Sequence, residues 1–364
     1  MGFRCGIVGL PNVGKSTIFN ALTAAGIEAR NYPFCTIEPN VGIVPVPDSR
    51  LDTLAAMVHT ANKVATQMEF VDIAGLVKGA SRGEGLGNTF LGHIRRVDAI
   101  VHVVRCFDDD NVVHVDGSVD PLRDREVINT ELVIADLETV ERRLAGTVKQ
   151  AKSGDRDMRR QAAFLTRLQE NLDRGRPARL LPLETVMEEA LLRELCLLTA
   201  KPVLYVANVG EDEIGGNRHT RDLAAAAAEE EAGMVIISGA IEEELSGLDE
   251  KEQREFVAEL GLAESGLNRL IKAGYELLGL ITFFTVGEKE TKAWTITAGT
   301  TAPRAAGKIH SDFERGFIRA EVIAYDDYVA CGGEAAARDQ GLMRSEGKEY
   351  VVCDGDCILF RFNV

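Results

Sequence analysis

Short apolar runs alternate with stretches of helical spacing along much of the chain. The runs occupy residues 4–9, 68–73, 99–106, 203–207 and 234–238. Runs of this length without an apolar–polar alternation are typical of strands that are buried on both faces of a sheet. The pattern therefore predicts an α/β fold with a largely parallel sheet between helices, in which a ligand binds beyond the carboxyl ends of the strands.

Two later parts of the chain depart from that alternation. Residues 127–200 are poor in strand signals and carry leucine, alanine and arginine at helical intervals, which predicts an inserted helical arm. Beyond Leu278, strand-like segments at residues 281–286, 293–296, 320–323 and 358–362 are separated by glycine-rich turns and predict a small α+β domain. We therefore expect one domain from residues 1–126 and 201–280, a helical arm over 127–200, and a last domain over 281–364.

The composition is that of a folded protein, since 45% of the 364 residues are hydrophobic and 27% are charged. With 41 basic and 57 acidic residues, the net charge of −16 disfavours coating of DNA or of an anionic membrane by the whole surface. Residues 142–179 nevertheless hold 11 basic and 4 acidic side chains, a net of +7, which leaves −23 for the remainder. There is no apolar run of about 18 residues and no signal-peptide pattern, so we expect a cytoplasmic protein without a membrane contact.

The seven cysteines are scattered and odd in number, which indicates reduced thiols rather than a disulfide framework. Cys353 and Cys357 flank three residues, but zinc normally requires a second pair of ligands at similar spacing, and the sequence offers none. We therefore expect neither disulfides nor a zinc site.

The segment GLPNVGKS, residues 9–16, matches the phosphate-binding pattern G-x-x-x-x-G-K-S/T and lies between a predicted strand and a predicted helix. Its glycines let backbone N–H groups curl around phosphate oxygens, and the helix N-terminus adds a favourable dipole. We expect Lys15 to reach the β- and γ-phosphates of a nucleotide and the Ser16 hydroxyl to bind Mg²⁺. The predicted phosphate-binding residues are Asn12, Val13, Gly14, Lys15, Ser16 and Thr17.

Two further segments favour a switch-type NTPase over other P-loop proteins. Asp72-Ile73-Ala74-Gly75 ends the next apolar run, where the Asp72 carboxylate is placed to hold Mg²⁺ through water and the Gly75 amide to sense the γ-phosphate. Earlier in the chain, Thr36 offers a loop hydroxyl that can close over the metal and the terminal phosphate. The predicted metal-binding residues are therefore Ser16, Thr36 and Asp72, and Lys15, Thr36 and Gly75 are candidates for the catalytic step.

The segment that reads the base departs from the GTPase pattern N-K-x-D, because the chain carries Asn208-Val209-Gly210-Glu211 after the run at 203–207. Guanine offers two adjacent donors to the aspartate of that pattern, whereas adenine offers one donor and a ring acceptor. The longer Glu211 and the missing lysine therefore weaken the preference for guanine, within the roughly 1–3 kcal/mol that a bidentate base contact carries. The predicted base-binding residues are Asn208, Val209 and Glu211, with Ser238, Gly239 and Ala240 supporting the base through backbone amides.

In Ras-like enzymes a glutamine orients the attacking water, but here Leu76 follows Gly75. An aliphatic side chain cannot orient water, and the glycine-rich residues 78–87 are expected to be mobile, so intrinsic turnover should be slow. His114, in the loop after the run at 99–106, is the candidate for positioning water. The alternative is that His114 caps a turn or faces solvent.

Together, residues 9–16, 31–36, 72–80 and 208–211 closely resemble the YchF (Obg-like) ATPases, and residues 293–296 and 307–320 resemble the C-terminal ubiquitin-like TGS region of that family. The resemblance implies a P-loop NTPase domain that is interrupted by a helical hairpin and followed by a TGS domain. It also implies hydrolysis of ATP in preference to GTP, and association with ribosomes in translation or stress responses. Leu76 and Asn208–Glu211 agree with the family, whose members depart from ordinary GTPases at the same places.

The basic arm points to a nucleic-acid contact independently of the resemblance. Its cationic residues are Arg142, Arg143, Lys149, Lys152, Arg156, Arg159, Arg160 and Arg167. They are suited to neutralise phosphates of ribosomal RNA on an otherwise acidic protein. Together with the TGS domain, they predict a contact with RNA or protein of the large subunit or the subunit interface. The alternative is a solvated helical hairpin.

The first functional hypothesis is a switch. ATP and Mg²⁺ order Thr36 and the loop after Asp72, hydrolysis to ADP and phosphate releases them, and the movement changes the affinity for a ribosomal partner. The alternatives are a GTPase translation factor, a small-molecule kinase, for which no second substrate pocket is obvious, and a redox- or stress-responsive binding protein whose nucleotide is mainly structural. Cys35, beside Thr36, is the residue that suggests the last of these.

Overall fold

The computed structural model describes residues 3–27, 40–73, 86–109, 111–152 and 155–363. The chain divides into two compact units, one made of Met1–Val44 and Glu69–Gly274 and the other of Pro45–Met68 and Tyr275–Val364. No helix within the described ranges combines the length and the apolar character that crossing a bilayer requires.

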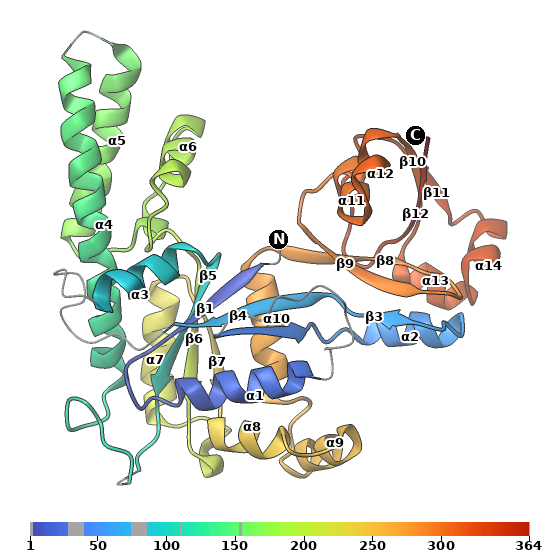
Figure 1. Cartoon of the computed structure of the whole chain (residues 1–364), viewed down its shortest axis with the longest axis horizontal. Helices are drawn as coiled ribbons and strands as arrows, with labels where there is room; N and C mark the ends of the chain where they lie inside the picture. The colour runs from blue at the N-terminus through green and yellow to red at the C-terminus, as the bar shows by residue number, and fades with distance from the viewer. Residues whose placement is uncertain (1–2, 28–39, 74–85, 110, 153–154, 364) are drawn as a thin grey trace. The chain divides into compact units, whose positions relative to one another are not determined.

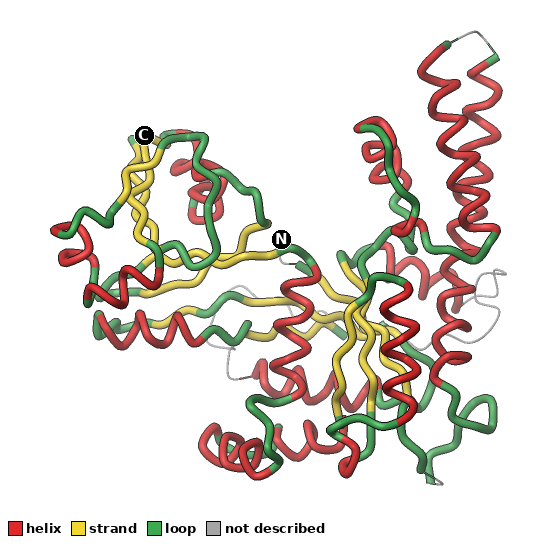
Figure 2. The backbone as a smooth tube through the Cα atoms, turned by 180° about the vertical axis from the view of Figure 1, so that it is seen from behind, coloured by secondary structure: helices red, strands yellow, loops and turns green. Residues whose placement is uncertain are grey.

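The first unit is built on a six-stranded sheet in the order β2-β4-β1-β5-β6-β7, with helices on both sides (Figures 1 and 2). Its strands are β1 (Arg4–Val8), β2 (Val41–Pro45), β4 (Gln67–Asp72), β5 (Ala99–Arg105), β6 (Val203–Asn208) and β7 (Gly233–Ile237). The strands from β4 to β7 in this order pair in parallel, and every residue of β5 and β6 is buried. The predicted α/β fold is therefore confirmed, because each of the five apolar runs forms a strand.

The helices of this unit place two N-termini at one edge of the sheet. The helices are α1 (Lys15–Ile27), α3 (Leu86–Arg95), α7 (Arg218–Glu229), α8 (Gly239–Leu245), α9 (Glu250–Glu259) and α10 (Gly266–Leu277). Helix α1 begins shortly after β1 ends and α8 shortly after β7 ends, and the two helices pack against each other. The carboxyl ends of the strands and these N-termini therefore face the same region, where a parallel sheet binds its ligands.

The helical arm consists of α4 (Pro121–Ala151), α5 (Arg156–Asp173), a short 3-10 helix (Ala178–Leu180) and α6 (Val186–Leu195), drawn in green in Figure 1. Helix α4 begins at Pro121, because Asp120 accepts a hydrogen bond from the backbone N–H of Arg123 and proline fits the first helical turn. Residue 127, the predicted start of the arm, therefore lies inside a continuous helix. Helices α4 and α5 pack together around buried Val140 and Phe164.

The second unit carries a sheet in the order β11-β10-β12-β8-β9-β3. Its strands are β3 (Lys63–Val64), β8 (Leu280–Thr285), β9 (Thr291–Thr297), β10 (Phe317–Ile323), β11 (Arg344–Glu346) and β12 (Cys357–Phe362). Helices α11 (Ala302–Ile309) and α12 (Ser311–Arg315) cover one apolar cluster around Phe283 and Phe360. Helices α2 (Ser49–Met57), α13 (Tyr325–Cys331) and α14 (Glu334–Asp339) cover a second cluster around Phe284. All four predicted strand segments lie in strands of this α+β unit.

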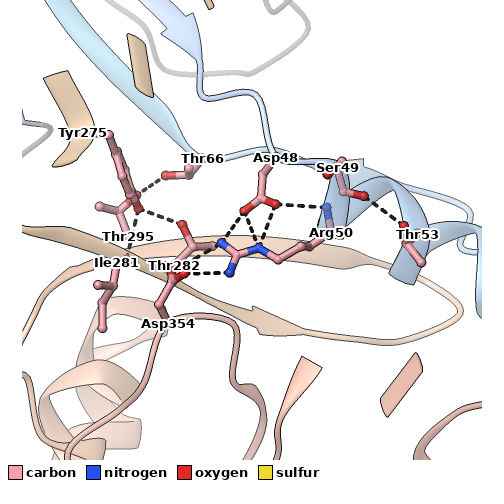
Figure 3. Close-up of polar contacts among 10 residues, drawn as sticks. All are labelled: Asp48, Ser49, Arg50, Thr53, Thr66, Tyr275, Ile281, Thr282, Thr295 and Asp354. Atoms are coloured by element: carbon pink, nitrogen blue, oxygen red, sulfur yellow. Dashed lines mark hydrogen bonds and ion pairs between the residues drawn. The ribbon is translucent and has the colours of Figure 1, made fainter. Parts of the chain in front are cut away.

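Residues 45–68, which fall within the range predicted for the first domain, belong to this second unit. Strand β3 pairs in parallel with β9, and Figure 3 shows the polar contacts that add to this pairing. Arg50 donates hydrogen bonds to Asp48 at 2.9 Å and to Asp354 at 2.7 Å, and Asp354 accepts the backbone N–H of Thr282 at 2.8 Å. Arg50 and Asp354 are 304 positions apart, so no local pattern in the sequence could reveal this contact.

Candidate nucleotide-binding site

The phosphate-binding loop joins the end of β1 to the start of α1, as its motif predicts. Asn12 and Gly14 both have left-handed backbone conformations, with φ of 62° and 88°. A Cβ atom on Gly14 would lie 2.1 Å from the side-chain nitrogen of Asn208, so only glycine fits at this position. The loop is thus shaped by its close approach to a residue that lies far away in the sequence.

At the phosphate end of the site, the Lys15 ammonium forms an ion pair with the Asp72 carboxylate. Both side chains are largely buried, with 10% and 19% of their surface exposed, so the pair is shielded from bulk water. Ser16 follows Lys15 in the first turn of α1 and adds a hydroxyl oxygen. A hydroxyl and a carboxylate are the hard oxygen ligands that Mg²⁺ prefers, so the side chains in this region fit the predicted metal.

At the base end of the site, the side chain of Asn208 connects two loops. Its amide nitrogen donates to the Val13 carbonyl at 2.8 Å, and its amide oxygen accepts the Gly239 N–H at 2.9 Å. Asn208 is buried at the carboxyl end of β6, where no solvent competes for these bonds. The phosphate-binding loop and the start of α8 are therefore held together by one side chain.

These loops surround a cleft of about 900 Å³. The predicted site residues that line it are Asn12, Gly14, Lys15, Ser16, Thr17, Asn208, Val209, Glu211, Gly239 and Ala240. The side chains of Val13 and Ser238 are buried beneath the cleft's surface, and the Ser238 hydroxyl has no hydrogen-bond partner among the described residues. Thr36 and Gly75, together with Cys35 and Leu76, lie outside the described residues.

The loop that follows β5 forms a further wall of the cleft, as expected for a loop at the carboxyl end of a parallel strand. Phe107, Asp108, Asp109 and Val112 of this loop line the cleft, although they were not predicted as site residues. A signal that could have indicated them is Arg105, a charged residue near the end of the otherwise apolar run at 99–106.

His114 lies beyond this loop and does not line the cleft. The ring is 8% exposed, its Nδ1 accepts the backbone N–H of Asp116 at 3.1 Å, and its Nε2 lies 2.7 Å from a carboxylate oxygen of Asp124. With Nδ1 as an acceptor, Nε2 carries the hydrogen and donates it to Asp124. Arg123 also donates to Asp124, at 3.0 Å. Both ring nitrogens of His114 are thus engaged with the protein in this arrangement.

Comparisons with known proteins agree with the fold and the motifs. A family profile described as a 50S ribosome-binding GTPase matches residues 4–136, and the profile YchF-GTPase_C, described as a protein of unknown function, matches residues 280–363. Relatives from Escherichia coli O157:H7 and Bacillus subtilis, both named ribosome-binding ATPase YchF, are 56% identical over the whole of this chain and the whole of theirs. The solved structure of the Schizosaccharomyces pombe YchF GTPase has a TM-score of 0.89 at 39% identity and covers 99% of this chain and 98% of that one.

Proposed function

The chain belongs to the YchF family, and from this membership and the geometry of the cleft we propose that it hydrolyses ATP to ADP and phosphate as a nucleotide-dependent switch. The observation that carries the proposal is the convergence of two groups of side chains on one cleft. Ser16 and Lys15, which pairs with Asp72, lie at one end, and Asn208–Glu211 lie with the start of α8 at the other. This is the distribution of charge and amides that a nucleoside triphosphate requires.

At the phosphate end, Lys15 would neutralise the terminal phosphates, and Ser16 and Asp72 would hold Mg²⁺, with Thr36 as a further ligand. The metal, when bound, neutralises charge on the β- and γ-phosphate oxygens. Lys15 and Asp72 pair with each other in the structure. When the nucleotide binds, this ion pair would break, so that the Lys15 ammonium could contact the phosphates and the Asp72 carboxylate could hold the metal. We assign the Gly75 amide to sensing the γ-phosphate.

The preference for ATP rests on the base end. The names of the relatives differ here, because the bacterial proteins are called ATPases and the yeast protein is called a GTPase. Glu211 stands where a GTPase has aspartate, and Val209 stands where it has lysine, so the two contacts that select guanine are altered. The cleft therefore favours adenine, or at least loses the strong selection of guanine.

Hydrolysis would be slow until a polar group orders the attacking water. We assign this role to His114, which must first exchange at least one of its hydrogen bonds to Asp116 and Asp124, since both ring nitrogens are engaged. The segment from His114 to Asp124 would then rearrange when nucleotide or partner binds. If His114→Ala leaves the turnover of ATP unchanged, His114 has no part in the reaction.

The experiment that tests the nucleotide assignment is a side-by-side titration of the purified protein with ATP and GTP in the presence of Mg²⁺. We expect tighter binding of ATP, release of free phosphate from ATP, and loss of both on Lys15→Ala. A tenfold preference for GTP would favour a GTPase factor instead, and transfer of phosphate to a small-molecule acceptor would favour a kinase. If the affinity for the partner is the same with ATP, with ADP and without nucleotide, the result would favour a binding protein whose nucleotide is mainly structural.

We also propose that the chain binds the ribosome in the cytoplasm through the basic arm together with its C-terminal unit. Of the eight arm cations predicted to contact RNA, three are engaged in ion pairs: Arg143 with Glu194, Arg160 with Asp157, and Arg167 with Glu184 and Glu188. The other five are exposed and have no ion pair among the described residues; they are Arg142, Lys149, Lys152, Arg156 and Arg159. These five are the groups available for RNA phosphates, because they give up no internal partner on binding.

Charge reversal tests this contact. The variant R142E/K149E/R159E should lose co-sedimentation with ribosomes and show a weaker dependence of binding on salt, by about one unit of log–log slope per lost phosphate contact. The matched control is R218E/K251E/R254E, which reverses the same number of exposed cations on α7 and α9. If both variants bind as the wild type does, the arm is not the contact.

A further inference from the structure

Arg105 is a buried cation for which the described residues provide no charged partner. Its side chain is 2% exposed, and it forms no ion pair with any residue that the structure describes. Burying a cation without a carboxylate is unfavourable by several kcal/mol unless its donors are satisfied in another way. Neutral groups accept the hydrogen bonds of Arg105 here, so its burial is not explained by an ordinary buried ion pair.

The partners of the guanidinium all belong to the loop that walls the nucleotide cleft. Arg105 donates to the carbonyls of Phe107 at 3.1 Å, Asp109 at 3.1 Å and Val112 at 2.9 Å. The guanidinium also lies over the Phe107 ring, 4.5 Å from its centroid. One side chain therefore fixes the loop at its beginning, its middle and its end.

Both ends of the same loop are tied to the nucleotide site. At its start, the Cys106 N–H donates to the Asn208 carbonyl at 2.7 Å. At its end, the side chain of Asn12 in the phosphate-binding loop donates to the Val113 carbonyl at 3.0 Å. The loop thus spans from the base end of the cleft to the phosphate-binding loop, with Arg105 beneath it.

We propose that Arg105 is a positioning residue for nucleotide binding, which holds Phe107, Asp108, Asp109 and Val112 as a preformed wall of the cleft. This inference rests on the proposed function and deepens it. A wall that is already ordered loses little conformational entropy when the nucleotide binds, and this raises affinity. The buried positive charge also offsets the negative charge of Asp108 and Asp109 beside a ligand that is itself an anion.

The wall contains none of the groups that we propose to touch the terminal phosphate or the metal, which are Lys15, Ser16 and Asp72, so we expect its effect on binding and not on the chemical step. We expect Arg105→Met to raise the Kd of ATP and the Kd of ADP by the same factor, about tenfold, which corresponds to one lost interaction of ordinary strength. Turnover at saturating ATP should stay within about twofold of the wild type, as is typical when uniform binding is lost. Arg105→Lys keeps the charge but reaches fewer carbonyls, so its Kd values should lie between those of the wild type and of Arg105→Met.

The control is Arg193→Met, which removes an exposed arginine of α6 and should change neither Kd nor turnover. A folded Arg105→Met protein with unchanged Kd values, or one that loses turnover while keeping its affinity, would overturn the assignment. Failure of the proposed function looks different, because then the wild-type protein itself would not bind or hydrolyse ATP.

A measurement on the wild-type protein covers the case in which the variants do not fold. The amides of residues 106–109 and 111–113 should exchange with deuterium slowly without nucleotide and change little when ATP and Mg²⁺ are added, since the wall is already formed. Fast exchange that becomes strongly protected on addition of ATP would show that the nucleotide, and not Arg105, orders the loop.

Discussion

The side chain of Asn208 makes two hydrogen bonds that point to different loops, one to Val13 and one to Gly239. Because both partners are backbone groups, the contact fixes the course of the chain and not only the position of a side chain. Gly14 packs directly against the same amide, and any side chain at that position would push it away. The consequence is that the two parts of the cleft where we propose that phosphate and base bind are joined by a single residue.

Replacing Asn208 by alanine should therefore weaken nucleotide binding at both ends of the cleft. Loss of two hydrogen bonds of about 0.5–1.5 kcal/mol each predicts a rise in the Kd of ATP of about 5- to 150-fold. Asn208→Asp keeps the acceptor for Gly239 but places an oxygen against the Val13 carbonyl, so we expect it to be impaired as well. Calorimetric titration checks this, with Asn268→Ala on α10 as the control, and equal Kd values for Asn208→Ala and the wild type would contradict it.

His102 shows how burial and neighbouring charges set the charge state of a residue. It lies in the middle of β5 beside the Tyr205 ring, and burial, together with the nearby cations Arg125 and Arg179, lowers the pKa of His102 to about 3. The imidazole is therefore neutral in the folded protein, whereas in the unfolded chain it takes up a proton near its ordinary pKa of about 6.5.

The sign of the resulting pH dependence follows from this difference. Between about pH 6.5 and pH 3 the unfolded chain binds a proton at His102 that the folded protein does not, so the free energy of unfolding falls as the pH falls. The slope from this group approaches about 1.4 kcal/mol per pH unit at most. Urea unfolding at several pH values should show a smaller slope for His102→Gln, while the exposed His59→Gln should follow the wild type. An unchanged slope for His102→Gln would refute the assignment.

At the scale of elements, the sequence predicted those whose signals are local. Five of the six strands of the first sheet coincide with the predicted apolar runs, and the phosphate-binding motif specifies both its loop and the helix that follows. Strand β2 was not predicted, because it has no distinctive pattern. The loop after β5 was predicted on the nucleotide side of the sheet, but its course was not, because that course depends on Arg105 bonding to carbonyls. Backbone carbonyls are present at every position, so the sequence cannot show which of them an arginine will bind.

The helical arm is likewise attached by a side chain that bonds to backbone groups far away in the sequence. Asp136 of α4 accepts the backbone N–H groups of Leu198 at 2.8 Å and Thr199 at 2.7 Å, and also the Thr199 hydroxyl at 2.6 Å. The residue is buried, and burial raises the pKa of its carboxyl group. Three donors converge on this one side chain, which joins the middle of α4 to the segment that leads into β6.

Asp136→Asn should accordingly destabilise the arm, although it keeps the shape of the side chain. An amide can accept at only one of its two positions, so its NH₂ group would face a backbone N–H and leave that group unpaired, at about 1–3 kcal/mol of unfolding free energy. Chemical unfolding measures the loss, and Glu138→Gln at an exposed position of the same helix should show none. Unchanged stability of Asp136→Asn would mean that the segment from Leu198 to Thr199 is held by its other contacts.

At the scale of the whole molecule, the division into compact units does not follow the order of the chain. The predicted ranges follow the chain order, whereas residues 45–68 pack with the C-terminal strands. Strand β3 has only two residues, and the contacts of Arg50 with Asp354 and of Thr66 with Thr295 in Figure 3 join remote positions. Periodicity reports which face of an element is buried, but it does not report which distant element covers that face.

Leu54→Ala tests this division of the chain. Leu54 of α2 is fully buried with Phe284, Ile323 and Tyr328, so its truncation should reduce the stability of the second unit by about 2–5 kcal/mol. Hydrogen exchange should then accelerate in β8 and β12 and remain unchanged in β1 and β6, and the Kd of ATP should not move. Leu165→Ala in the core of the arm is the matched substitution, and it should leave β8 and β12 protected. If Leu54→Ala instead accelerates exchange in β1 and β6, residues 45–68 belong energetically with the nucleotide-binding unit, as chain order alone would predict.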